Sequence, residues 1–204
     1  MSKKENNNSL CPLPAKVVFF ATGNIHKFNE VRNILSPLGF AVAMLRMKGD
    51  EIQSDSIQQI AQNAASNAYK RTGLPIFVED AGLFITALEG FPGPYAAYVF
   101  KTIHNKGILK LMQNEKNRQA EFQSVIVYID STIKKPTLFL GVSKGIITQS
   151  ERVEQGKSGF GFDPIFQPND SDKTFAEMTI DEKNGFSHRA MATKKFAQWH
   201  KQKQ

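Results

Sequence analysis

The stretch KVVFFATGN at residues 16–24 decides the class of fold. Its first six residues are apolar, β-branched or aromatic after the opening lysine, which is typical of a short buried strand. The following segment has apolar residues at helical spacing, and we expect a helix that ends before Gly39. A buried strand that turns directly into an amphipathic helix predicts the first βα unit of an α/β protein. The periodic positions of this helix are Ile25, Phe28, Val31, Ile34, Leu35 and Leu38.

The alternation of strand and helix continues downstream. Strands are expected at 40–47 and 74–78, and the second ends in Glu79-Asp80-Ala81-Gly82. Between them lies a helix that reaches about residue 72, with Ser54 or Asp55 as its cap.

The second half of the chain favours hairpin strands. Prolines and glycines make GFPGPY at 90–95 a rigid turn before a further helix. Residues 121–129 and 137–147 are expected to pair as antiparallel strands. A C-terminal helix from Phe186 onward takes Ser187 as its N-cap. Together these elements predict a mixed-sheet α/β protein without repeats or internal linkers.

Length and composition indicate a single domain. The chain has 204 residues, 41% of them hydrophobic and 22% charged, as in ordinary globular proteins. We expect residues 1–15 to be a disordered leader and 16–204 one domain. No apolar run approaches the ~20 residues that span a bilayer, so no membrane partner is expected. The single cysteine, Cys11, excludes an internal disulfide and favours the cytoplasm.

The net charge of +7 raises the question of nucleic-acid binding. Residues 1–16 contribute +2 and residues 190–204 contribute +4, which leaves +1 for the body of the chain. A nucleic-acid-binding domain usually carries its basic stripe on the folded face. The charge distribution therefore favours solvated basic ends and no nucleic-acid partner.

Four groups of residues could carry chemistry, and the first is the turn Thr22-Gly23-Asn24-Ile25-His26-Lys27. A glycine admits a ligand close to the backbone, and the helix start supplies amides and partial positive charge. Lys27 comes round on the first helical turn, so the stretch favours phosphate. It lacks the Walker pattern, and taken alone an ordinary strand-to-helix turn with a surface lysine explains it as well.

The second group is acidic: Glu51, Glu79 and Asp80. Glu79 and Asp80 end a predicted central strand, where ligands of open α/β sheets gather. Neighbouring residues of a strand point to opposite faces, so only one of the pair can face a given site. That carboxylate and Glu51 could share a Mg²⁺ that also holds substrate phosphates. Solvated carboxylates at a strand end are the alternative.

The third group is Phe160-Gly161-Phe162-Asp163. A ring with glycines beside it can stack on a base, worth on the order of 1–3 kcal/mol. At least one of the two phenylalanines is expected in the core instead. Asp163 is more telling, because a carboxylate buried there without a partner is costly.

The fourth group is Lys183 with Ser187-His188-Arg189. Cations are unfavourable at the start of a helix, so a ligand edge or an anion is expected to compensate His188 and Arg189. A capped helix with a surface arginine is the alternative.

With these groups in chain order, the sequence resembles the inosine triphosphate pyrophosphatase family from about Lys16 to Phe196. Six motifs in order carry the resemblance, which makes it far more specific than any one of them. They are Thr22-Gly23-Asn24 with Lys27, Glu79-Asp80-x-Gly82-Leu83, Gly90-x-Pro92-Gly93-Pro94-Tyr95, Phe160-Gly161-x-Asp163-Pro164, Phe175-Ala176-Glu177-Met178, and Lys183 with Ser187-His188-Arg189.

The resemblance implies an elongated mixed β-sheet flanked by helices, with two lobes, a central nucleotide-binding cleft and a homodimer. The implied activity is Mg²⁺-dependent hydrolysis of ITP, dITP and XTP to the monophosphate and pyrophosphate. The matching motifs imply that Thr22 to Lys27 and Lys183 hold the phosphates, while Glu51 and Asp80 bind the metal. Asp80 would also orient or deprotonate the attacking water.

The same matching implies how the base is held. Phe160 would stack on the base, and Asp163, His188 and Arg189 would read its edge. Hypoxanthine and xanthine carry a 6-keto acceptor for Arg189 and an N1–H donor for Asp163, whereas adenine presents the reverse pattern. Polar mismatches of this kind discriminate sharply. Gly161, Phe162, Ala81 and Ser187 complete the substrate-binding residues that the motifs imply.

Three positions depart from the family pattern. Many relatives have a lysine on the second helix where this chain has Asn67 or Gln59, and Lys70 is a possible replacement. Ala81 stands where serine is frequent, and Phe162 where tyrosine or tryptophan is common. These departures affect the expected rate and substrate ranking, not the reaction class.

Two other functions stay open at this point. A pyrophosphatase for other modified or pyrimidine triphosphates would be indifferent to the 6-keto group, so Asp163→Asn would not change its preference for ITP over ATP. A nucleic-acid-binding protein would lose steeply salt-dependent binding when residues 190–204 are removed.

Overall fold

The computed structural model describes residues 16–47, 52–133, 135–154 and 159–203; the leader predicted at 1–15 lies outside them. The strands are β1 (Lys16–Ala21), β2 (Phe40–Leu45), β3 (Ile76–Ile85), β4 (Pro92–Gly93), β5 (Gln119–Ile129), β6 (Thr137–Ile147) and β7 (Phe166–Pro168). The helices are α1 (Ile25–Leu35), α2 (Ile57–Thr72), α3 (Ala96–Leu111), α4 (Ile180–Phe186) and α5 (His188–Gln202).

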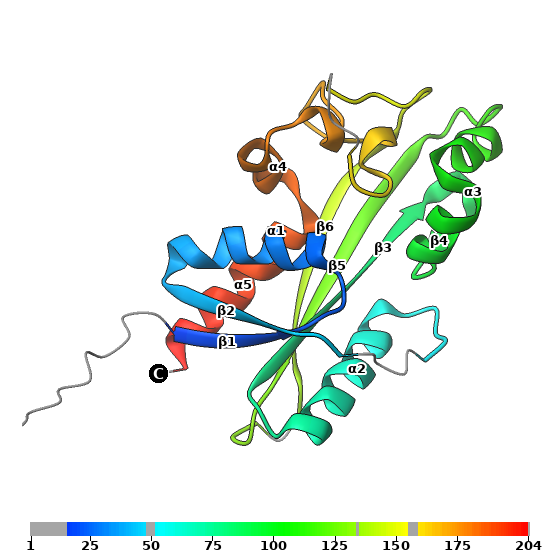
Figure 1. Ribbon diagram of the computed structural model, residues 1–204. Coiled ribbons are helices and arrows are strands. Elements are labelled where there is room, and N and C mark those ends of the chain that lie inside the picture. The colour runs from blue at the N-terminus through cyan, green and yellow to red at the C-terminus, as the bar shows by residue number, and fades with distance from the viewer. Residues whose placement is uncertain (1–15, 48–51, 134, 155–158, 204) are drawn as a thin grey trace, which may run out of the picture.

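These strands form one mixed sheet in the order β2-β1-β3-β5-β6-β7, with β4 paired to β3. β1 pairs in parallel with β2 and β3, whereas β3, β5, β6 and β7 pair antiparallel to one another. Figure 1 shows β5 and β6 running the length of the molecule, with helices gathered around both of their ends. The predicted α/β class and mixed sheet are therefore confirmed.

The buried apolar side chains separate into clusters at different ends of the long strands. Around α1 and α5, one cluster includes Phe20, Phe77 and Phe196, and a second lies under α2. At the other end, Phe122 and Phe166 belong to a cluster that also takes in α3 residues. This division matches the two lobes that the family resemblance implies.

Gly141 on β6 explains how the start of α5 reaches the sheet. A Cβ atom added at Gly141 would lie 2.0 Å from the carbonyl oxygen of His188 and 2.7 Å from the amide nitrogen of Ala192. Only a residue without a side chain allows this approach. The backbone of α5 therefore packs directly on the sheet, which brings Arg189 over β3.

Several elements differ from the sequence-based expectations. Glu79 to Gly82 lie inside β3 and not at its end, because β3 continues to Ile85 and pairs with β5 along its whole length. Ser56, not Ser54 or Asp55, caps α2 by accepting a hydrogen bond from the Gln59 amide.

The C-terminal region also holds an unpredicted helix. Phe186 is the last residue of α4, and α5 begins at His188 with Ser187 as the cap between them, as predicted. α4 is a short, mostly polar helix whose residues are not buried, so it lacks an apolar period that the sequence could have revealed. In the described part of the chain, none of the helices has the length and apolarity to cross a membrane.

Candidate functional site

A cavity of about 870 Å³ opens where β1 ends and β3 continues beyond it. This is the position where ligands of open α/β sheets bind. Most of the predicted site residues line it, whereas Ile25, His26, Lys183 and Ser187 are not in its wall and Glu51 lies outside the described residues. The predicted residues in the wall are Thr22, Gly23, Asn24, Lys27, Asp80, Ala81, Phe160, Gly161, Phe162, Asp163, His188 and Arg189.

The turn from β1 to α1 forms one end of the cavity. Asn24 caps α1, and its Oδ1 accepts hydrogen bonds from the amides of His26 (2.9 Å) and Lys27 (3.2 Å). These two amides are therefore occupied, contrary to the expectation that the helix start offers free amides. A Cβ atom built on Gly23 would meet no atom within 4 Å, so the space beside this backbone is open.

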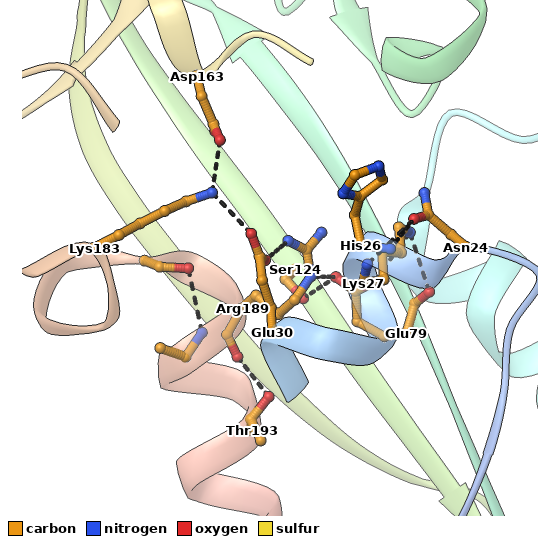
Figure 2. Close-up of polar contacts among 12 residues, drawn as sticks. Asn24, His26, Lys27, Glu30, Glu79, Ser124, Asp163, Lys183, Arg189 and Thr193 are labelled. Atoms are coloured by element: carbon orange, nitrogen blue, oxygen red, sulfur yellow. Dashed lines mark hydrogen bonds and ion pairs between the residues drawn. The ribbon is translucent and has the colours of Figure 1, made fainter. Parts of the chain in front are cut away.

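Figure 2 shows a chain of alternating charges that begins at Asp163 and ends at Glu79, both of which line the cavity. The Nζ of Lys183 lies 2.7 Å from Oδ2 of Asp163 and 2.9 Å from Oε1 of Glu30. Arg189 forms two ion pairs. Its Nη1 pairs with Glu30, and its Nε lies 3.1 Å from Oε1 of Glu79. The chain thus ties α4, α1, α5 and β3 together with the short turn at 163–165.

Lys27 connects this chain to the turn. Its Nζ lies 3.0 Å from Oε2 of Glu79 and 3.8 Å from Oδ1 of Asp80, and it donates to the carbonyl oxygen of Glu79 at 3.3 Å. Ser124 on β5 donates to Oε1 of Glu79 at 2.6 Å. The Glu79 side chain, which is 0% exposed, is therefore held by three different elements.

The carboxylates of Glu79, which is buried, and of Glu30, whose side chain is 21% exposed, stay ionised. Burial alone would raise the pKa of Glu79, but Arg189 and Lys27 outweigh it and lower that pKa to about 2. Burial also raises the pKa of Glu30, but Arg189 and Lys183 outweigh this effect and lower that pKa to about 2. Each negative charge is compensated by protein cations, so these two groups form a fixed framework.

Asp163 behaves differently although it lies in the same chain. Burial raises the pKa of its carboxyl group, and Lys183 offsets only part of that effect. The pKa of Lys183 is raised, because Asp163 and Glu30 outweigh the burial of its ammonium. Asp163 is thus the carboxylate at the end of the chain of ion pairs whose negative charge is least compensated by protein cations. It lines the cavity.

His188 adds a neutral polar edge to the wall. Its ring stacks on Phe122 with centroids 4.6 Å apart and an angle of 8° between the planes. Burial, and then Arg189, lower the pKa of the imidazole well below its ordinary value. Within the described residues its buried Nδ1 has no hydrogen-bond partner, which is uncommon for a buried polar atom.

Arg189 itself is only 4% exposed, so the alternative of a surface arginine on a capped helix is excluded. Glu30 and Glu79 compensate the charge of Arg189 at the start of α5, and His188 is neutral there.

The two phenylalanines have separate places. Phe162 is buried and packs edge-on against Phe100, with centroids 5.4 Å apart, so it is the core ring that the sequence predicted. Phe160 is partly exposed in the cavity wall, where a flat ligand can reach it.

The donor set at Asp80 suits a magnesium ion. The Asp80 side chain remains 26% exposed in the cavity wall, whereas Glu79 is enclosed by its protein partners. Mg²⁺ keeps several waters and needs only one or two carboxylates besides substrate phosphates. In the described part of the chain three potential ligands do not converge, and Glu51, the predicted second ligand, lies outside that part.

Four site residues escaped the sequence analysis: Glu30, Arg71, Lys101 and Ser124. Glu30 lies three residues after Lys27, on the same face of α1, and this spacing is a signal that could have been used. Arg71 and Lys101 line the cavity from α2 and α3, where polar helix positions do not differ from ordinary exposed ones. Nothing in the strand pattern distinguishes Ser124.

Of the residues that depart from the family pattern, Asn67, Ala81 and Phe162 line the cavity. Asn67 lines the cavity and donates from Nδ2 to Oδ1 of Asn63 at 3.0 Å, whereas Gln59 receives a hydrogen bond from Ser54 at the start of α2. Lys70 is not in the cavity wall, but its neighbour Arg71 is.

An open α/β sheet with a deep cavity at the end of its parallel strands is the architecture of a nucleotide-binding protein. The capped turn with Lys27 at one end and the polar wall beside Phe160 at the other fit that class. The chain belongs to the Ham1 family, whose model matches residues 18–199.

Sequence relatives and solved structures agree with this membership. The chain is 48% identical over 184 residues to the dITP/XTP pyrophosphatase of Methanopyrus kandleri, covering 90% of this chain and 96% of that protein. It is 48% identical over 183 residues to the Thermococcus kodakarensis protein of the same name, with 90% and 96% covered. The Staphylococcus aureus Ham1 protein superposes with a TM-score of 0.79 at 25% identity, covering 93% of this chain and 100% of the other.

Proposed function

We propose that this protein hydrolyses the non-canonical purine nucleoside triphosphates ITP, dITP and XTP to the monophosphate and pyrophosphate. The observation that carries the proposal is the polar wall at Asp163, His188 and Arg189, which is fixed by buried ion pairs beside the exposed face of Phe160. The names of the archaeal relatives support the same substrates.

The wall favours bases with a 6-keto group and an N1–H. The Asp163 carboxylate accepts from N1–H, and a donor from the Arg189 or His188 side meets the 6-keto oxygen. Adenine would place the lone pair of its N1 against the carboxylate and leave buried polar groups unpaired, which costs about 1–3 kcal/mol or more for each group. The proposed discrimination is therefore against ATP. Lys183, which does not line the cavity, would hold Asp163 in place instead of binding phosphate.

The opposite end of the cavity would bind the triphosphate. Lys27, Arg71 and Lys101 bring positive charge to its wall, and the open space beside Gly23 admits a phosphate close to the backbone. We assign Asp80 to orient or deprotonate the water that attacks the α-phosphorus. Mg²⁺ bound there would supply charge neutralisation for the transferring phosphoryl group.

We further propose that the protein acts as a homodimer that clears deaminated purine nucleotides from the precursor pool. Leu140 and Ile146, on one face of β6, are 38% and 39% exposed, which supports a partner surface. Sedimentation analysis of the purified protein tests the dimer. A cytoplasmic location stays a prediction.

The structure offers little support for nucleic-acid binding through the C-terminus. Three of the basic residues there, Lys194, Lys195 and Lys203, make contacts within the protein. Lys195 donates to the carbonyl oxygen of Leu140 at 2.7 Å, and Lys203 lies 2.7 Å from Asp130.

The test is a substrate panel of ITP, XTP, GTP and ATP, with and without Mg²⁺, with the products identified by chromatography. The proposal expects ITP and XTP to be cleaved far faster than ATP, with monophosphate and pyrophosphate as products and no turnover after chelation. Equal cleavage of all four substrates would refute the proposed role of the polar wall. Release of inorganic phosphate would refute attack at the α-phosphorus.

A further inference from the structure

We propose that His26 is a positioning residue that braces Phe160, so that a bound base stacks on a ring already held from behind. The inference rests on the proposed function in one respect, namely that the base lies on Phe160. It gives a role in this reaction to a side chain outside the cavity wall.

The observation is a stack between two segments far apart in the chain. The His26 imidazole and the Phe160 ring have centroids 4.9 Å apart and planes inclined by 28°. His26 lies on the first turn of α1, and Figure 2 shows its ring projecting away from Lys27 and Glu79. Its side chain is exposed, so the stack is not a by-product of a closed core.

The backbone around Phe160 explains why this ring needs support. The two flanking residues, Gly159 and Gly161, have φ angles of +64° and +59°, in the left-handed region that glycine adopts readily. A Cβ atom built on Gly161 would meet no atom within 4 Å, so neighbouring atoms do not enclose the chain on that side. On the other side the backbone is anchored, because a Cβ atom on Gly159 would lie 2.8 Å from the Cβ of Ala176 and the Phe160 carbonyl accepts from the Asp163 amide at 3.1 Å. The backbone therefore fixes where the Phe160 ring begins, and contacts of the ring itself fix how it is tilted.

The spacing of the two rings decides which face of Phe160 a base can use. A base between them would need two successive contacts of about 3.5 Å each, roughly 7 Å in total. The observed separation of 4.9 Å leaves no room for it. The cavity wall contains Phe160 but not His26, so the base takes the cavity-facing side and His26 holds the opposite side.

The brace also connects the two ends of the site. Asn24 accepts hydrogen bonds from the amides of His26 and Lys27, so the residue that supports the stacking ring belongs to the turn proposed for phosphate. A change at the His26 side chain should affect ligands that carry a base and leave phosphate ligands unaffected.

The experiment measures binding of IMP and of inorganic pyrophosphate by calorimetry to the full chain and its His26→Ala and His26→Phe variants. Aromatic pairs contribute enough that His26→Ala should weaken IMP binding roughly three- to tenfold. Pyrophosphate binding should stay unchanged, and His26→Phe should restore IMP binding because it restores the stack. Asn29→Ala, an exposed residue of the same helix outside the cavity wall, is the matched control and should bind both ligands normally.

Four results would overturn the brace. IMP binding that is unchanged in His26→Ala, or that is not restored by Phe, would remove the stacking argument. Tighter IMP binding in His26→Ala would mean that the histidine occupies the place of the base. Failure of the unmodified protein to bind IMP would remove the stack on Phe160. Binding is measured without turnover, so a protein that binds IMP in this pattern but does not hydrolyse ITP would refute the proposed function alone.

Discussion

The two ends of the cavity are built on different principles. At the end proposed for the base, Arg189 pairs with the enclosed Glu79 and with Glu30, whose side chain is 21% exposed, and Asp163 lines the cavity at the end of that chain. At the phosphate end, Asp80 is 26% exposed and the space beside Gly23 is open. At the first end the charged side chains already pair with one another, whereas the second end has space for a ligand and a metal ion.

The difference shows where each property of the enzyme would arise. A framework whose charges are already compensated does not rearrange when a base arrives, so a wrong donor or acceptor is penalised in full. An open end can admit several phosphates and a hydrated cation, whose charges complete the site. Lys27 contacts both Glu79 and Asp80, which makes it the point where the two ends meet.

The largest effect is expected at the open end. Asp80→Asn should lower the turnover of ITP by roughly 10²–10⁴-fold, because it removes both the proposed metal ligand and the proposed acceptor for the proton of water. The unfolding midpoint should change little, since the side chain is partly exposed. Steady-state pyrophosphate release measures the effect, with Asp181→Asn as an exposed control outside the cavity wall. Turnover within threefold of the unmodified protein would count against Asp80.

The next prediction compares the loss of a buried ion pair with the loss of an exposed one. Glu79→Gln should lower the free energy of unfolding by about 3 kcal/mol, because Arg189 and Lys27 lose the charge that compensates them in the interior. Urea denaturation measures this loss. The matched control is Glu182→Gln, whose pair with Lys173 is exposed and should matter much less. Equal losses in the two variants would contradict a buried framework.

Lowering the pH should first reduce the selectivity for ITP and only then reduce the free energy of unfolding. The pKa of Asp163 is raised, so on acidification its carboxylate is protonated first and the preference for ITP over ATP declines. Glu30 and Glu79 have pKa values of about 2 in the folded state against an ordinary 4.5, so their contribution to stability is complete above 4.5 and is lost as pH falls from there toward 2. Parallel pH profiles of selectivity and unfolding free energy test this order. Coincident declines would oppose it.

The smallest effect is expected at the mouth of the open end. Lys101→Ala should raise the KM for ITP roughly tenfold by removing one cation from the cavity wall, with inhibition by IMP unchanged. Lys106→Ala, on the same helix but outside the wall, controls for the change in net charge. Identical KM values in the two variants would remove Lys101 from the site.

Sequence reasoning was reliable where short-range patterns determine structure. The run at 16–21, the helix from Ile25 and the pairing of β5 with β6 all follow from local periodicity, and the structure confirms them. Most of the residues that the family resemblance implied line one cavity, although Glu79 to Gly82 lie inside β3 and Lys183 and Ser187 are outside the wall. Glu30 and Ser124 were missed because their roles depend on which face of α1 meets α5 and which strand lies beside β3. Such tertiary pairings leave no local signal.

The central claim is that the framework determines the base and the open end determines the chemistry. The most direct test is the ratio of kcat/KM for ITP to that for ATP in the unmodified protein, Asp163→Asn and Asp80→Asn. We predict that Asp163→Asn reduces this ratio by roughly a hundredfold, because the amide no longer favours N1–H over a lone pair. Asp80→Asn should lower both values and leave the ratio unchanged. A ratio that survives Asp163→Asn, or that collapses in Asp80→Asn, would contradict the account.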